Sequence, residues 1–168
     1  MHSFSWYVML MLMLIGVATP LAHAAETTPA PSNGIDYPKG WQDWRAISVS
    51  HRADNNTIRL ILGNDVAVKA ARTGKTNPWP DGAILGKIVW KAVQMDNWKD
   101  ANVPGNLLHA EFMLKDSKKY AESYGWGWGR WLGLEQKPFD QGATSCIDCH
   151  TPVKDRDWVF TQPAVLPR

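Results

Sequence analysis

The chain has 168 residues, and its 18 basic and 16 acidic side chains leave a formal net charge of +2. This near balance gives no electrostatic argument for nucleic acid or an anionic membrane as a partner. The length suits one domain with a hydrophobic core of its own. Two cysteines, separated by only two residues, leave no disulfide framework to replace such a core.

The first 24 residues have the pattern of a secretory signal peptide. Residues 7–17 are apolar, and Ala22-His23-Ala24 is a small-x-small cleavage site. The segment before the apolar run has His2 but no Lys or Arg, so an uncleaved membrane anchor is the alternative. The apolar run is short for a membrane span, which needs about 20 residues. We therefore expect export to the periplasm and cleavage near Ala24.

Residues 25–36 are rich in Thr, Pro and Ser and predict a flexible lead-in to a single domain at 37–168. Near the start of that domain, Trp41 and Trp44 have the spacing of one face of a short helix. Residues 47–49 alternate in polarity, which favours a strand.

The next segment predicts a turn, a strand and a helix. Asp54-Asn55-Asn56 is a turn signal, and the β-rich run at 57–62 follows it. Gly63-Asn64-Asp65 then ends the strand and caps a helix from about 66 to 72.

The rest of the chain predicts three more strands, at 83–93, 107–114 and 125–134. We expect less regular structure elsewhere: a polar loop at 95–105, a short helix at about 116–120 and a terminal helical turn at 155–160. Together these elements predict an α+β fold, a mostly antiparallel β-sheet with short flanking helices.

One charged residue is conspicuous within the strand at 83–93. Lys87 shares a face with Leu85 and Val89. A free ammonium is costly to bury on such a face, and a buried lysine tends to lose its charge and become nucleophilic. The alternative is a surface lysine whose charged end extends into water, as is expected for Lys91.

The pentapeptide Cys146-Ile147-Asp148-Cys149-His150 carries the most specific chemistry. Cys-x-x-Cys-His is typical of a c-type haem attachment site. Two thiols at this spacing can add to the two vinyl groups of one haem, and His150 is then placed to ligate the iron. A thioredoxin-like redox pair lacks its preceding βαβ unit here, and a zinc site lacks further cysteines. We therefore expect one haem c per chain.

Together with this motif, three other stretches make the chain resemble the cytochrome P-460 family. They are residues 57–59, residues 79–87, and residues 113–120 followed by 125–127; the motif itself is followed by 157–161. The resemblance implies a mostly antiparallel β fold, a homodimer and one c-type haem per subunit, with His150 as its only protein ligand. In the hydroxylamine-oxidising members a lysine is bonded to the porphyrin, and Lys87 matches it. The related β-type cytochromes c′ lack this bond and bind gases such as nitric oxide.

The resemblance also implies residues for the open side of the haem. Arg59 matches a distal arginine that would stabilise negative charge on a bound ligand. The alternative is an exposed arginine in an ordinary salt bridge. The family has a phenylalanine four residues earlier, where this chain has Asn55, so we expect a more polar or more open pocket. A carboxylate upstream of the motif assists some members, and the candidates are Asp140 and Glu135.

Four other side chains are rival sixth ligands, which would make the chain an electron-transfer cytochrome. They are His51, His109, Met95 and Met113.

Two functions follow from these observations. The first is a periplasmic mono-haem cytochrome with an open sixth site, which oxidises hydroxylamine or acts on related small nitrogen or oxygen ligands. Lys87, Arg59 and Asp140 would be its catalytic residues, and a soluble cytochrome would accept the electrons. The alternative is a non-enzymatic nitric-oxide-binding or electron-transfer cytochrome of the β-type cytochrome c′ kind. Peroxidase-like chemistry is compatible with both.

Overall fold

A computed structural model describes residues 35–140 and 142–167. Its centre is one six-stranded antiparallel sheet in which every strand pairs with its neighbour in sequence, in the order β1 to β6. The strands are β1 (Arg45–Arg52), β2 (Thr57–Gly63), β3 (Ile84–Met95), β4 (Trp98–Lys115), β5 (Trp126–Leu132) and β6 (Lys137–Pro138). The helices are α1 (Asp65–Thr73) and α2 (Thr144–His150), with 3-10 turns η1 (Trp41–Asp43), η2 (Ala121–Ser123) and η3 (Thr151–Arg156). The predicted signal peptide and most of the lead-in lie outside the described residues.

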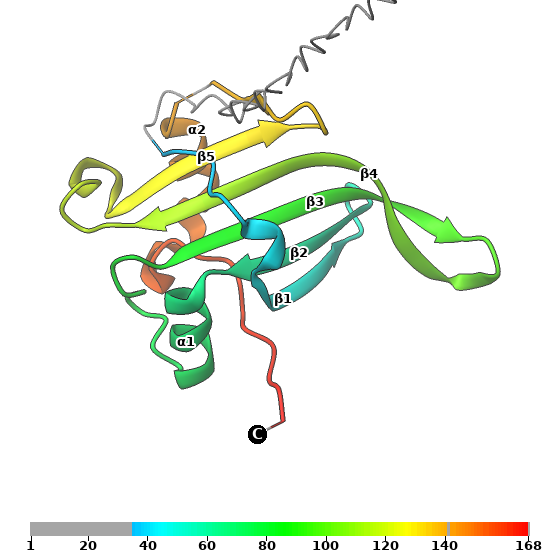
Figure 1. Ribbon diagram of the computed structural model, residues 1–168, viewed down its shortest axis with the longest axis horizontal. Helices are drawn as coiled ribbons and strands as arrows, with labels where there is room; N and C mark the ends of the chain where they lie inside the picture. Colours follow the sequence, from blue (N-terminus) through cyan, green and yellow to red (C-terminus); the bar gives the residue numbers. More distant parts are fainter. Residues whose placement is uncertain (1–34, 141, 168) are drawn as a thin grey trace, which may run out of the picture.

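The two faces of the sheet carry different segments of the chain. The N-terminal segment with η1 crosses the near face in Figure 1, whereas α2 and the C-terminal segment lie behind the sheet. We call the face under the N-terminal segment the closed face, and the face under α2 the cavity face. The β3–β4 hairpin extends beyond both layers as a two-stranded arm (Figure 1).

The closed face is packed with aromatic side chains. Phe112 of β4 is 1% exposed and contacts Trp131 of β5 edge-on, with ring centroids 5.8 Å apart. Tyr37 packs edge-on against both rings. β5 makes room for this layer because Gly129 faces it: a Cβ there would lie 2.6 Å from Trp131. The glycines of the Gly/Trp-rich strand therefore lie where neighbouring aromatic rings need space.

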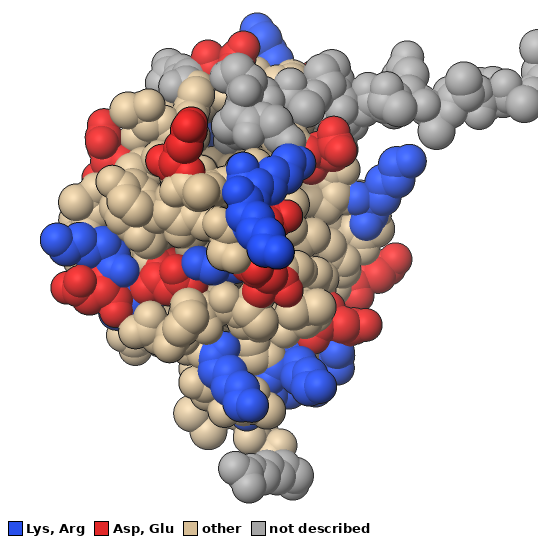
Figure 2. Space-filling model, turned by 90° about the vertical axis from the view of Figure 1, so that its left-hand side faces the viewer, with Lys and Arg blue, Asp and Glu red and all other residues tan. Residues whose placement is uncertain are grey.

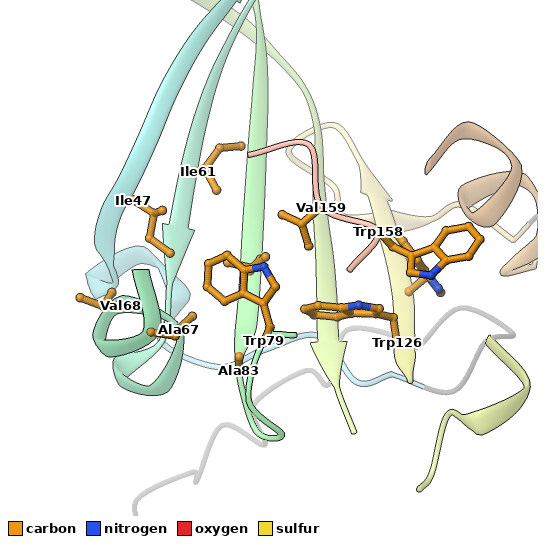
Figure 3. Packing of buried hydrophobic residues seen from close by; sticks show 12 residues of the cluster. Ile47, Ile61, Ala67, Val68, Trp79, Ala83, Trp126, Trp158 and Val159 are labelled. Carbon is orange, nitrogen blue, oxygen red and sulfur yellow. The ribbon is translucent and has the colours of Figure 1, made fainter. Parts of the chain in front are cut away.

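The cavity face has a second hydrophobic cluster, at the end of the sheet next to α1. Asn64 caps α1 by accepting a hydrogen bond from the Ala67 amide at 3.0 Å, and Ala67 and Val68 then pack inward. Trp79 lies between these α1 residues and Trp126 (Figure 3). This cluster joins α1 to the C-terminal segment and leaves the middle of the face free.

Most of the predicted elements are confirmed, and the α+β antiparallel fold with them. The predicted polar loop at 95–105 is wrong, because residues 98–105 are the first part of β4 and pair with the end of β3 in the projecting arm. Most of their side chains are exposed, and Asn102, Pro104 and Gly105 are residue types that strands seldom contain, so the sequence indicates a loop.

Two predicted helical segments also differ from the structure. Residues 117–120 form a single turn in which the Asp116 carboxylate accepts hydrogen bonds from the amides of Lys118 and Lys119. The predicted turn at 155–160 is earlier, as η3, and ends at Arg156. It ends there because the next residue, Asp157, adopts a left-handed conformation.

On the face shown in Figure 2, basic and acidic side chains are interspersed. None of the described helices is long and apolar enough to cross a membrane.

Candidate functional site

A row of charged side chains crosses the middle of the cavity face. The strand register places Lys87 of β3 opposite Glu111 of β4, and Glu111 opposite Arg130 of β5. Directly opposed residues of antiparallel strands project from the same face, so the three side chains meet there. We call Lys87, Glu111 and Arg130 the charged row.

Glu111 is the centre of the charged row. It forms an ion pair with Lys87, its Oε1 atom lies 2.6 Å from Arg130 Nε, and His109 Nε2 lies 3.2 Å from the same oxygen. Burial acts to raise the pKa of Glu111, but the positive charges of Lys87 and Arg130 outweigh it and hold the pKa below its usual value. The carboxylate is therefore ionised at neutral pH.

The Cys-x-x-Cys-His motif forms α2, which lies over the same face. Cys146 and Cys149 are three residues apart in this helix, so they lie on one side of it, and neither is in a disulfide. The His150 ring, at the end of α2, packs edge-on against Trp128 of β5 and against Phe160, with centroids 4.7 and 5.1 Å away. These contacts fix the plane of the imidazole.

One hydrogen bond fixes the tautomer of His150. Its Nδ1 lies 2.7 Å from the Trp158 carbonyl oxygen, and because a carbonyl can only accept, Nδ1 carries the proton. Burial lowers the pKa of His150, which favours the neutral ring. A neutral imidazole with a proton on Nδ1 has its free lone pair on Nε2, which is the form that ligates a metal.

The charged row and the motif border one cavity of about 490 Å³. Four of the five buried side-chain atoms that lack a hydrogen bond, within the described part of the chain, belong to residues lining it. They are Arg59 Nε and Trp128 Nε1, together with Glu111 Oε1 and Arg130 Nε, which face each other in the ion pair without the geometry of a hydrogen bond. Buried polar atoms are normally satisfied, so their concentration here is a sign of a site built for a bound group. The volume is within the range of small-molecule and cofactor pockets.

Comparison with known protein families gives one match. The sequence profile of the family Cytochrome P460 matches residues 38–161. The chain belongs to the cytochrome P460 family. No curated protein matches the sequence.

Membership of the cytochrome P460 family makes the chain a haem cytochrome and implies haem c. The cavity fits that group. Both cysteines of the chain and His150 line it, so the residues that would hold a haem by two thioether bonds and one iron ligand are together. The aromatic rings of Trp128 and Phe160 add apolar walls.

The structure brings some of the predicted site residues of this P460-family chain together and separates others. Lys87, Arg59 and Met113 line the cavity with the motif. Asp140 and Glu135 are exposed and do not line it. Asn55 lies in an exposed turn and accepts a hydrogen bond from the Thr57 hydroxyl, so it does not make the pocket more polar.

Of the rival ligands, His51, His109 and Met95 lie outside the cavity lining. Sequence analysis missed Glu111 as a site residue. The available signal was strand register: Glu111 is on the same face of its strand as Met113, and an acid directly opposite a buried lysine is its natural partner.

Proposed function

We propose that this member of the cytochrome P460 family is a mono-haem c-type cytochrome that oxidises hydroxylamine, or acts on closely related small nitrogen ligands, at a site left open on the haem. The observation that supports this most is the charged row, because it puts an ionised carboxylate on the wall of the cavity that the haem motif borders, in the same lining as the unsatisfied donors Arg59 Nε and Trp128 Nε1. An apolar wall would favour the gas-binding alternative.

The haem would supply the ligand-binding iron and accept electrons one at a time. Conversion of hydroxylamine to nitric oxide releases three electrons and three protons, so the site needs a proton acceptor. The Glu111 carboxylate is ionised and borders the cavity, which suits it to this role as a general base. We therefore assign to Glu111 the role that the sequence suggested for Asp140.

Arg59 and Lys87 would act beside Glu111. Arg59 Nε is buried without a hydrogen bond, so it can donate to the oxygen of a bound ligand. Lys87 reaches the cavity from β3 and is the side chain that a bond to the porphyrin would use. Export to the periplasm, a soluble cytochrome as electron acceptor and a homodimer complete the proposal.

The test is a comparison of two acid-to-amide variants of the haem-loaded protein. Glu111→Gln is expected to lower hydroxylamine-dependent reduction of a soluble cytochrome acceptor by about 100-fold. Glu122→Gln changes an exposed acid outside the cavity and is expected to keep the wild-type rate. A loss in Asp140→Asn instead of Glu111→Gln would contradict the assignment. A wild-type protein that binds nitric oxide but gives no turnover would support the gas-binding alternative.

The role of Lys87 has its own measurement. Proteolysis of the haem-loaded protein followed by mass spectrometry is expected to give a haem peptide that retains the Lys87 segment along with the motif. Lys87→Leu should release that segment and slow turnover, whereas Lys91→Leu, an exposed lysine on the same strand, should change neither. A wild-type haem peptide without the Lys87 segment excludes the cross-link.

A further inference from the structure

The Trp158 carbonyl that accepts the hydrogen bond from His150 belongs to an unusual piece of backbone. Asp157 and Trp158 have φ angles of 51° and 64°, both in the left-handed region that side-chain-bearing residues rarely adopt. Two such residues in succession persist only when their surroundings hold them in place. What holds them therefore also holds the acceptor of the His150 hydrogen bond.

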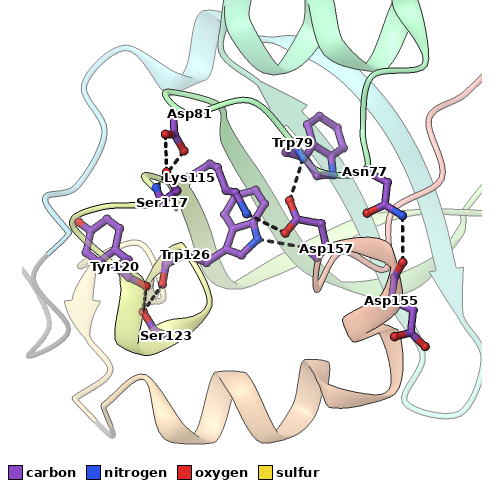
Figure 4. A network of polar contacts seen from close by, with 10 residues as sticks. All are labelled: Asn77, Trp79, Asp81, Lys115, Ser117, Tyr120, Ser123, Trp126, Asp155 and Asp157. Carbon is purple, nitrogen blue, oxygen red and sulfur yellow. Dashed lines mark hydrogen bonds and ion pairs between the residues drawn. The ribbon is translucent and has the colours of Figure 1, made fainter.

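Asp157 is held by three contacts from distant parts of the chain (Figure 4). Its Oδ1 accepts a hydrogen bond from Lys115 Nζ at 2.7 Å, and its Oδ2 accepts one from the Trp79 amide at 2.8 Å. Its backbone carbonyl accepts one from Trp126 Nε1 at 2.9 Å. The Lys115 and Asp157 side chains are only 7% and 10% exposed, so this is a buried ion pair.

Lys115 is itself anchored in the sheet. It is the last residue of β4, and its amide donates to the Ala83 carbonyl at 2.9 Å. Its Nζ lies 4.9 Å from the centre of the Trp126 ring, and a Cβ on Gly125 would lie 3.2 Å from that nitrogen. Gly125, with φ of +81°, has no side chain, so it leaves room for the end of the Lys115 side chain. The ion pair thus connects the sheet to the segment that follows η3.

We propose that the buried Lys115–Asp157 ion pair positions the proximal histidine, by holding the Trp158 carbonyl where it accepts the hydrogen bond from His150 Nδ1. This inference rests on the proposed ligation of haem iron by His150. Neither member of the pair lines the cavity, so both act through His150 and not on a bound ligand. A histidine that donates its Nδ1 proton to a fixed acceptor is a stronger electron donor to its metal, and this stabilises the ferric state.

The test uses the haem-loaded protein and two readouts that report on the proximal ligand. They are the iron–histidine stretching frequency of the ferrous protein, from resonance Raman spectra, and the midpoint reduction potential, from spectroelectrochemistry. Asp157→Asn keeps the shape of the side chain and a residue type that tolerates the left-handed conformation. We expect a lower stretching frequency and a more positive potential, because the weakened hydrogen bond makes His150 a poorer donor.

The double variant Lys115→Met/Asp157→Asn covers the case in which a single variant fails to fold, because it leaves no unpaired buried charge. It should show the same two shifts. Asp155→Asn is the matched control, because it makes the same change two residues earlier at an exposed side chain that points away from the Lys115–Asp157 ion pair (Figure 4). It should shift neither the stretching frequency nor the potential.

If the double variant loses stability but keeps both wild-type values, the pair is only structural and the proposal is wrong. A wild-type protein without an iron–histidine stretch would instead overturn the ligation by His150 and, with it, the proposed function. The two failures are therefore distinguishable in the same experiment.

Discussion

The two faces of the sheet are packed differently, although the same strands form both. On the closed face, aromatic rings fill the space, and Tyr120 has the single unsatisfied hydroxyl among the buried polar atoms of the described chain. On the cavity face, the same strands carry the charged row, the unsatisfied donors Arg59 Nε and Trp128 Nε1, and a cavity. The contrast indicates that the closed face supplies stability, while the cavity face keeps the space and the donors that a cofactor and its ligand require.

The largest difference between the faces is expected from neighbouring residues of β4. Phe112→Ala empties the centre of the closed face and should lower the free energy of unfolding by about 3–5 kcal/mol. Met113→Ala, the next residue, shortens a side chain that is only half-buried and should lower it by less. Urea unfolding of both haem-loaded variants measures the difference. Equal losses would mean that the two faces contribute alike.

A second change tests the close packing of the closed face without removing any atoms. Gly129→Ala introduces a Cβ 2.6 Å from Trp131 and 2.8 Å from Ile35, so both side chains or the strand itself have to move. We expect the free energy of unfolding to fall by about 1–3 kcal/mol, as for other overpacked cores. An unchanged free energy of unfolding, from thermal and urea unfolding, would show that the aromatic layer can accommodate the added methyl group.

On the cavity face, Glu111→Gln leaves Lys87 and Arg130 without their shared acid and should cost about 1–3 kcal/mol at neutral pH. Because the pKa of Glu111 lies below its usual value of 4.5, its contribution is present above that pH and is lost as pH falls through the lowered pKa. Unfolding measured from pH 7 to pH 3 should therefore show the wild type and the variant converging in acid. A constant difference would argue against the pKa direction.

The smallest effect is expected at His109, at the edge of the charged row. Burial lowers its pKa, with Arg130, Lys87 and Arg59 acting in the same direction and Glu111 opposing them. The unfolded chain therefore takes up a proton near pH 6.5 while the folded protein does not, so stability falls as pH drops below that value. His109→Gln should flatten this slope and change the free energy of unfolding by about 1 kcal/mol or less at pH 7. An unchanged slope would contradict the burial of this ring.

Much of the fold could be predicted because most strands have one buried face, and such strands alternate apolar and polar residues in the sequence. In β5, Trp126, Trp128 and Arg130 occupy every second position, and these three residues lie together on the cavity face. The β4 half of the arm was missed because most of its side chains are exposed and because Asn102, Pro104 and Gly105 are residue types that strands seldom contain. The conformation of Asp157 was missed because neither residue type nor spacing encodes a left-handed turn there.

The candidate site also has residues that the sequence could predict and residues that it could not. Cys146, Cys149 and His150 are adjacent in the chain, so their chemistry could be recognised locally. Lys87 and Arg59 were selected as site residues with the help of the family resemblance. The structure places both in the cavity lining. Asp140 was chosen for its closeness to the motif in sequence, but it is exposed and does not line the cavity, whereas strand pairing brings Glu111 into the lining.

By itself, the sequence determined the haem motif, the alternating strands and the family, because these depend on neighbouring residues and their order. Only the tertiary structure decided which acid faces the cavity and what holds the segment whose carbonyl accepts the hydrogen bond from His150. Glu111 meets Lys87 through strand register, and Asp157 meets Lys115 across 42 positions of the chain. Each of these contacts joins two segments that are distant in sequence, and it forms only when both segments are packed in the folded protein. Neither segment alone shows which partner it will meet.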